Sequence, residues 1–261
     1  MTSKGIDRIA VLGSSSSTGF GTGGRSYGTL VGQALGAGCV ENLSKFGRTT
    51  ELMVEEDLPL VAALSPDLVI VEAGMGDSLP HPGQWVQGML ERFAPKTWHG
   101  VEGLERRAYF RGTRPQRAQQ WVTARAKTTL KRTLIQLTGG YTRATPAGFG
   151  EAFERLITEL EGIAPVVVSV GMFDVDQHLF PKQHEMNLPF RQQRFAVLSG
   201  HQNVIAVEIN QRLHQWADYH DDHAHWNASG HATVADEILQ TLQVVPSLAT
   251  AVPNPSGASP S

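Results

Sequence analysis

Residues suited to nucleophilic catalysis lie near both ends of the chain. Four consecutive serines, Ser14 to Ser17, follow a short apolar run, and Asp222 and His225 lie three positions apart towards the other end. A serine hydroxyl is nearly inert by itself and needs a neighbouring base. A carboxylate hydrogen-bonded to an imidazole fixes its tautomer and stabilises the imidazolium formed when the serine proton is taken. The order serine, aspartate, histidine therefore predicts nucleophilic acyl chemistry by one of the four serines.

The same N-terminal stretch supports a second reading as a phosphate-binding loop. Gly19, Gly21 and Gly24 have the spacing of a dinucleotide-binding glycine motif, and Glu41 could bind a ribose hydroxyl. Such a motif opens directly off its strand, so that a helix N-terminus faces the pyrophosphate. Here the glycines begin six residues beyond Gly13, after the four serines. A nucleotide-binding α/β protein without catalytic activity stays an alternative prediction.

The segment around the aspartate and histidine is also rich in residue types that bind metals. Its possible zinc ligands are Asp218, His220, Asp222, His223 and His225. All of them fall on one predicted loop, whereas a metal site usually draws its ligands from several elements. We therefore expect no metal, and we interpret the residues outside the Asp222–His225 pair as solvated loop positions.

Apolar runs that are typical of buried strands alternate with helical patterns. The predicted strands are residues 9–12, 39–43, 66–74, 164–171 and 203–209. Between them apolar residues recur at helical spacing, as from Tyr27 to Leu35 before Gly36. Strands separated by helices are parallel, which predicts a doubly wound α/β sandwich. Ligands bind outside the carboxyl ends of such strands, so the loops that follow the strands are expected to carry the site.

Two regions depart from this alternation. Residues 80 to about 150 separate two predicted strands by more than one crossover helix needs, which predicts an inserted helical cap over the site. Residues 245–261 are rich in Pro, Ser and Ala, and we expect a disordered tail. The predicted organisation is one α/β domain over residues 5–244 with this insertion.

A basic cluster occupies the predicted insertion. Nine Lys or Arg and no acidic residue lie between Arg106 and Arg132. One interpretation is a solvated helix face opposite an apolar stripe. The other is recognition of an anionic substrate or donor, with Arg106, Arg107 and Arg111 as candidate contacts. Nucleic acid is disfavoured as a partner because aromatic residues do not interleave the cluster in a stacking pattern.

Composition restricts the remaining classes. The chain has 261 residues, a formal charge of −3 and a sequence pI near 6.4, which give no global reason to expect nucleic acid or a membrane surface as partner. Cys39 is the single cysteine, so an internal disulfide is excluded and a reducing compartment is favoured. No run is apolar enough to span a bilayer and no charged leader precedes an apolar stretch, so we expect a cytoplasmic protein.

The residues quoted above carry a family resemblance. Residues 13–19, GSSSSTG, align with the G-D-S-x-[ST]-x-G block of the SGNH hydrolases, the superfamily of GDSL-type esterases and lipases. The resemblance implies that Ser15 is the nucleophile. It places Ser14 where the family usually has an aspartate, a loop-supporting position outside the triad.

Two further blocks of the family follow in order. The second block matches Asn42, Leu43, Gly47 and Thr49, and the last block matches Asp222, His225, Asn227, Gly230 and His231. The resemblance implies that the backbone N–H groups of Ser15 and Gly47 bind the oxyanion. His231 falls at the start of the last predicted helix, where we expect packing or capping.

The third family block, G-x-N-D, is altered. It falls on residues 74–77, so that Gly76 stands where the family has an oxyanion-binding asparagine. Losing one such donor costs roughly 3–4 kcal/mol of transition-state stabilisation. Either another donor or a water replaces it, or activity is low or lost. A turn that simply requires glycine is the plainer explanation.

A second, shorter resemblance concerns the acyl donor. The stretch GMGDSLP and the tripeptide at 225–227 are similar to the diglucosylglycerate octanoyltransferases, which implies acyl-CoA as a donor and an alcohol as acceptor. We expect Asp77, besides the arginines named above, to contact the substrate. Trp226 is expected either to line the acyl pocket as a further substrate contact or to belong to the core.

The sequence thus predicts a three-layer α/β/α sandwich of the SGNH-hydrolase type with about five parallel strands. The predicted function is serine-dependent esterase or acyltransferase chemistry on a small or glycosidic ester, thioester or alcohol. No cofactor is expected.

Overall fold

The computed structural model describes residues 5–99 and 113–244. Within these residues five parallel strands form one sheet in the order β2-β1-β3-β4-β5. The strands are β1 (Arg8–Leu12), β2 (Cys39–Asn42), β3 (Leu68–Glu72), β4 (Val166–Val170) and β5 (Val204–Val207). Four strands fall within ranges predicted as strands, and β1 begins one residue before its predicted range, at Arg8. The expected parallel sheet of five strands is confirmed.

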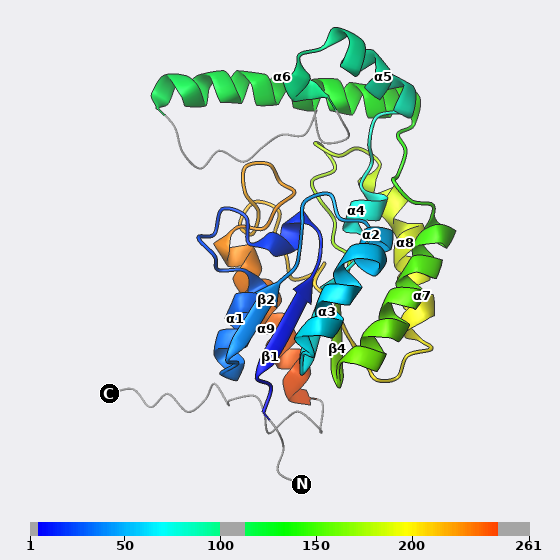
Figure 1. Ribbon diagram of the computed structural model, residues 1–261. Coiled ribbons are helices and arrows are strands. Elements are labelled where there is room, and N and C mark those ends of the chain that lie inside the picture. The colour runs from blue at the N-terminus through cyan, green and yellow to red at the C-terminus, as the bar shows by residue number, and fades with distance from the viewer. Residues whose placement is uncertain (1–4, 100–112, 245–261) are drawn as a thin grey trace.

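Helices cover both faces of the sheet and make the three layers seen in Figure 1. Helices α1 (Tyr27–Leu35) and α9 (Ala228–Val244) pack together on one face. Helices α3 (Leu58–Leu64), α7 (Pro146–Ile163) and α8 (Gln183–Leu198) lie on the other. Because both faces are covered, the central strand β3 is buried at every position, which explains why Leu68 to Val71 are all apolar.

Local signals in the sequence account for the helix boundaries. Ser26 caps α1 by accepting a hydrogen bond from the Thr29 N–H, and Gly36 ends it in the left-handed conformation. Thr145 caps α7 in the same way, and Pro146 occupies the first turn, where its missing N–H is harmless.

The chain order reverses at the centre of the sheet, since β2 lies on one side of β1 and β3 on the other. Such a reversal opens a crevice outside the carboxyl ends of the strands. The short 3-10 helix η1 (Ser15–Thr18) follows β1 at this edge, and the single-turn helix α4 (Met75–Ser78) follows β3. The serine block after β1 and the altered block at residues 74–77 after β3 therefore lie at the same edge of the sheet.

The inserted segment lies beyond this edge of the sheet (Figure 1). It contains α5 (Gln84–Phe93), the 3-10 turn η3 (Lys96–Trp98) and α6 (Arg114–Thr138). Its two stems are joined where the backbones of His81 and Tyr141 exchange two hydrogen bonds of 2.9 Å. Because α7 packs on the sheet, the inserted part ends before Pro146, a few residues earlier than the sequence suggested.

Some sequence expectations fall outside the described residues. They concern Arg106, Arg107 and Arg111 of the basic cluster, and the tail at residues 245–261. Among the helices that are described, none is long and apolar enough to cross a membrane.

Candidate active site

Ser15, His225 and Asp222 meet at the carboxyl edge of the sheet. His225 Nε2 lies 2.8 Å from Ser15 Oγ, and His225 Nδ1 lies 2.8 Å from Asp222 Oδ2. An ionised carboxylate can only accept, so Nδ1 carries the proton of the neutral imidazole and Nε2 accepts from the Ser15 hydroxyl. The three side chains thus form a continuous chain of hydrogen bonds that ends on the serine oxygen.

Asp222 is held in its ionised form by its surroundings. Its side chain is buried, and Oδ1 accepts from the backbone N–H groups of Ala224 and His225, each at 3.0 Å. Burial raises the pKa of Asp222, but the hydrogen bonds from His225 and from the two backbone N–H groups outweigh it, and the pKa lies below its ordinary value. The carboxylate therefore orients the imidazole at neutral pH.

Of the four serines, only Ser15 is partly exposed to solvent. Ser14, Ser16 and Ser17 are all at most 5% exposed. The η1 helix turns the Ser15 side chain to His225, while its neighbours point into the protein. The position implied by the family resemblance is thus also the one whose hydroxyl lies against an imidazole.

The buried serines contact a carboxylate that sequence reasoning missed. Glu72 Oε2 accepts from the Ser14 N–H at 3.1 Å, from Ser14 Oγ at 2.7 Å and from Ser17 Oγ at 3.1 Å. Tyr27 extends this network by donating its hydroxyl to Ser17 Oγ at 3.0 Å. Glu72 supplies, from the end of β3, a carboxylate beneath the loop that carries Ser14, the position where the family resemblance implies an aspartate. The available signal was one acidic residue ending an otherwise apolar strand.

Burial dominates the titration of this carboxylate. Glu72 is fully buried, and loss of solvation raises its pKa to about 7, although the hydrogen bonds from Ser14 and Ser17 act in the opposite direction. Its charge therefore changes near neutral pH, directly below the loop that carries Ser15.

Gly47 approaches the same site on the loop that follows β2. Its φ of 65° lies in the left-handed region, which favours glycine. The adjacent Arg48 is buried and binds the Asp57 carboxylate through Nε at 2.9 Å and Nη2 at 2.7 Å. A bidentate pair of this kind fixes the loop next to Ser15.

The backbone itself explains why glycine occupies position 76. A Cβ built on Gly76 would lie 1.7 Å from the carbonyl oxygen of Arg48 and 2.7 Å from its carbonyl carbon. No side chain fits there unless the Gly47–Thr49 segment moves. The close approach of the two loops therefore requires glycine at position 76.

Asp77 holds those two loops together and does not face a substrate. Its carboxylate is 2% exposed and accepts from Thr50 N at 3.0 Å and Thr50 Oγ1 at 2.8 Å. Burial raises its pKa, opposed by the bonds from Thr50. The expectation that Asp77 contacts the substrate is corrected, because its oxygens are already bound inside the protein.

Arg143 is a second functional candidate that the sequence did not reveal. Its backbone N–H donates to the Asp77 carbonyl at 2.9 Å, and its guanidinium donates to the Gly47 carbonyl. The side chain lines the same cavity as Ser15, Gly47 and Gly76. No motif marks this position, because the insertion separates it from the strands by a long stretch of chain.

We call this space the serine cavity. Its volume is about 60 Å³, and its wall includes Ser15, Gly47, Gly76, Arg143 and His225. Phe20 and Phe46 flank His225 with ring-centroid distances of 5.7 and 5.6 Å. These rings restrict the imidazole to one orientation and limit the access of water to it.

Trp226 belongs to the hydrophobic core and not to the substrate pocket. It is 0% exposed and packs against Phe173, Tyr27 and His231 with centroid distances of 4.6, 6.0 and 5.7 Å. The expected substrate contact is therefore wrong. His231 is also fully buried, and its Nδ1 accepts from the Tyr27 N–H at 3.2 Å, in line with the expected packing role.

Solved structures of low sequence identity share this fold. TesA aligns at 15% identity with a TM-score of 0.56, over 91% of this chain and 98% of TesA. A catalytic mutant of the acetylxylan esterase Axe2 from Geobacillus stearothermophilus aligns at 15% identity and a TM-score of 0.56, over 92% and 96% of the two chains. The psychrotrophic esterase EstA from a Pseudoalteromonas species aligns at 11% identity and 0.54, over 91% and 97%.

These alignments span nearly the whole of each chain, and they show that the chain shares the α/β fold of these proteins. Sequence comparison adds no closer relative: no protein-family model matches the chain, and no curated protein matches it.

The raised pKa of Glu72 predicts a pH-dependent stability. Its folded-state pKa of about 7 exceeds the ordinary value of 4.5, so the folded protein retains a proton that the unfolded chain has lost. The stabilisation by protonated Glu72 is complete below pH 4.5 and disappears as pH rises to about 7. A difference of this size corresponds to roughly 3 kcal/mol.

Glu72→Gln removes this titration. The free energy of unfolding of the variant relative to wild type should rise by up to roughly 3 kcal/mol between pH 4.5 and 7.5, as measured by urea denaturation at each pH. Glu159→Gln, at an exposed position of α7, is the matched control. A constant difference between wild type and Glu72→Gln over this range would contradict the assignment.

The close approach at Gly76 predicts a specific cost for a methyl group. Gly76→Ala should destabilise the protein by about 1–3 kcal/mol, because the added Cβ displaces the Arg48 backbone. Gly162→Ala, in α7 with no atom within 4 Å of the added Cβ, should instead leave stability equal or raise it by up to about 1 kcal/mol. Equal thermal midpoints for Gly76→Ala and wild type would disprove the steric explanation.

Proposed function

We propose that the protein is an enzyme of serine-dependent acyl-ester chemistry that works through an acyl-enzyme on Ser15. The observation that carries this proposal is the hydrogen-bonded chain from Ser15 Oγ through His225 to Asp222, with both distances at 2.8 Å. A fold shared with the acetylxylan esterase Axe2 and the esterase EstA gives further support.

The proposed reaction has two halves. Ser15 Oγ attacks the acyl carbonyl carbon while its proton passes to His225 Nε2, and the carbonyl oxygen becomes an oxyanion. When the tetrahedral intermediate collapses, His225 returns the proton to the departing alcohol or thiol and the acyl group stays on Ser15. His225 then takes a proton from an incoming water or alcohol as its oxygen attacks the acyl-enzyme carbonyl. When this second intermediate collapses, the bond from the acyl carbon to Ser15 Oγ breaks and His225 returns the proton to Ser15 Oγ. Asp222 stabilises the imidazolium in both halves.

The oxyanion is assigned to three groups. The backbone N–H groups of Ser15 and Gly47 supply two donors, as the family resemblance implies. Arg143 supplies positive charge where the family has its asparagine, because its side chain lines the serine cavity beside Gly76. The Asp77 carbonyl and the Gly47 carbonyl hold Arg143 in place. A preorganised charge in a partly closed cavity stabilises the transition state more than the ground state.

The small volume of the serine cavity favours a short acyl group. At about 60 Å³ it is far smaller than the 300–1,000 Å³ of typical ligand pockets. We therefore expect acetyl or propionyl esters to be better substrates than octanoyl esters.

Hydrolysis and acyl transfer differ only in the group that attacks the acyl-enzyme. Transfer to an alcohol is the second candidate, and it is favoured by the insertion beyond the site edge, where an acceptor could displace water. Acyl-CoA is then a possible donor. Incubation with an acyl donor, with and without polyols, followed by mass analysis of the products distinguishes the two.

The triad assignment predicts a large loss of activity. Ser15→Ala and His225→Ala should each lower kcat for p-nitrophenyl acetate by roughly 10³-fold or more, since the members of a triad act as a unit. Ser199→Ala, on the exposed end of α8, is the control and should retain wild-type rates. Retention of activity by Ser15→Ala would rule out the proposed mechanism. An inactive wild type whose melting temperature rises with NAD would favour the nucleotide-binding alternative.

The role of Arg143 predicts a loss in kcat more than in KM. Arg143→Gln should lower kcat by about 10²–10³-fold, as loss of one oxyanion donor does elsewhere, and Arg143→Lys should restore part of it by returning the charge. Arg155→Gln on α7, which pairs with Glu51, is the matched control. A kcat within threefold of wild type for Arg143→Gln would exclude it from the oxyanion site.

A further inference from the structure

A second and much larger cavity lies next to the serine cavity. Its volume is about 840 Å³, within the range of small-molecule sites, and we call it the large cavity. Val175 lines both cavities, and His223 in the wall of the large one precedes Ala224 and His225 in the wall of the other. The two cavities therefore adjoin at Val175, so a molecule that fills the large cavity can reach the serine cavity.

One face of α6 forms a wall of the large cavity. Trp121, Arg125, Thr128 and Arg132 recur at intervals of three or four residues and all line it. The loops that follow β4 and β5 form the opposite side, with Trp216 and Asp174. The large cavity thus exists only because the insertion lies over the sheet edge.

Two indole rings in the wall are exposed to an unusual degree. Trp121 is 52% exposed and Trp216 is 81% exposed, although both are large apolar side chains. The edge of His223 packs against Trp216 at a centroid distance of 4.4 Å, and Arg125 lies over the Trp121 ring at 5.1 Å. Exposed aromatic rings on two sides of one cavity provide surfaces on which a sugar or base ring can stack.

The charge of the wall favours an anion. Arg125 and Arg132 line the cavity, and within the described part of the chain neither has an acidic partner. Of the two acidic side chains in the wall, Asp174 is paired with an arginine outside it. Asp174 binds Arg191 and His184, and Asp176 accepts from the His178 N–H and faces His223. Planar guanidinium groups are suited to bidentate binding of phosphate or carboxylate.

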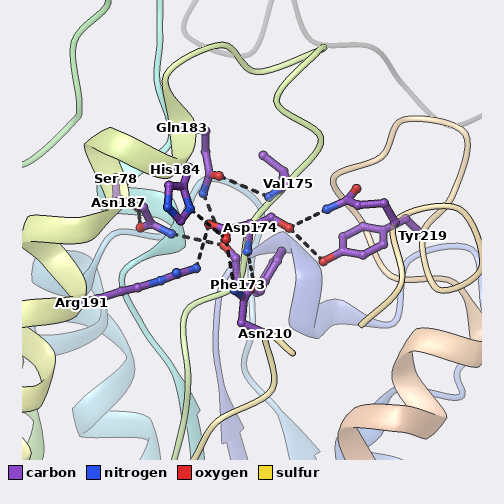
Figure 2. Close-up of polar contacts among 11 residues, drawn as sticks. Ser78, Phe173, Asp174, Val175, Gln183, His184, Asn187, Arg191, Asn210 and Tyr219 are labelled. Atoms are coloured by element: carbon purple, nitrogen blue, oxygen red, sulfur yellow. Dashed lines mark hydrogen bonds and ion pairs between the residues drawn. The ribbon is translucent and has the colours of Figure 1, made fainter. Parts of the chain in front are cut away.

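A network of hydrogen bonds surrounds Asp174 in the wall of the large cavity. The Asp174 carboxylate accepts hydrogen bonds of 2.8–3.1 Å from His184, Arg191 and Asn210. Figure 2 shows these three side chains around it. The Asp174 carbonyl accepts from the Tyr219 hydroxyl at 3.2 Å and from Gln215 at 2.7 Å. Because Gln215 precedes Trp216, these bonds tie the two loops together and preorganise the site.

We propose that the large cavity binds the alcohol or thiol portion of the substrate, and that this portion carries a ring and an anionic group. The ring stacks on Trp121 and Trp216, and its phosphate or carboxylate binds Arg125 and Arg132. The inference rests on the proposed function, in which the short acyl group occupies the serine cavity. Two sources have this shared chemistry: a sugar acid or sugar phosphate, and a nucleotide-bearing thioester such as acyl-CoA.

Calorimetric titration of the full chain distinguishes the sources. The probes are coenzyme A, glucose 6-phosphate and glucuronate, and the comparison ligands are glucose and inorganic phosphate. At least one ring-bearing anion should bind ten times more tightly than both comparison ligands. Tight binding of coenzyme A alone identifies the thioester source, and binding of either sugar anion identifies the glycosidic one. If no ring-bearing anion binds more tightly than glucose and inorganic phosphate, the inference is wrong.

Variants locate the binding site. Trp121→Ala, Trp216→Ala and the double variant Arg125→Gln/Arg132→Gln should each weaken binding of the positive probe at least tenfold. The matched controls are on α5 and do not line the cavity: Trp85→Ala, also an exposed indole, and Arg92→Gln, also stacked on an aromatic ring. Melting temperatures verify that each variant is folded. Equal weakening by variants and controls would overturn the assignment.

Hydrolysis of p-nitrophenyl acetate by wild type shows which proposal has failed, the serine-dependent function or the ligand site in the large cavity. Turnover that depends on Ser15, together with no binding of any ring-bearing anion, refutes the large-cavity inference and leaves the proposed function intact. Absence of Ser15-dependent turnover refutes the proposed function, and the inference about its substrate fails with it.

Discussion

The hydrogen bond between Ser15 Oγ and His225 Nε2 is the contact on which the rest of the site depends. It joins residues 210 positions apart. A buried carboxylate binds the loop of the serine, and a second one binds the histidine. Glu72 binds the loop under Ser15 through Ser14 and Ser17, and Asp222 binds the opposite nitrogen of His225. The parallel sheet makes this possible because the carboxyl ends of its strands lie at one edge.

The two carboxylates act under different electrostatic conditions. Asp222 receives three hydrogen bonds from the His225 segment, and its pKa is lowered in spite of burial. Glu72 also accepts three hydrogen bonds, yet burial dominates and raises its pKa to about 7. One carboxylate is thus kept ionised beside the imidazole, while the other titrates near neutrality beneath the serine loop. The altered Gly76 position belongs to this same rigid region, where Asp77 binds Thr50 across two loops.

Much of this arrangement could be predicted from the sequence. Runs rich in apolar residues predicted the strands, because a parallel sheet covered on both faces needs such runs, although the edge strand β2 also includes Glu41 and Asn42. The motif register selected Ser15, the serine that the structure places against His225. Contacts between residues far apart in the sequence could not be predicted when no motif links the two residues. Arg143 reaches Gly47 only because the insertion stems close at His81 and Tyr141, and Trp226 enters the core although it adjoins His225. Glu72 ends its strand without any motif, so a local pattern could not distinguish a buried acid from a solvated one.

Activation of Ser15 by His225 is tested most directly by covalent labelling. The chain is treated with a small alkyl fluorophosphonate, and the modified residue is identified by peptide mass spectrometry. A serine polarised by an imidazole reacts readily with such a phosphonate, whereas other hydroxyls do not. The account predicts that wild type is labelled on Ser15 alone and that His225→Ala is not labelled. Labelling of a different residue, or equal labelling of Ser15 in His225→Ala, would contradict it.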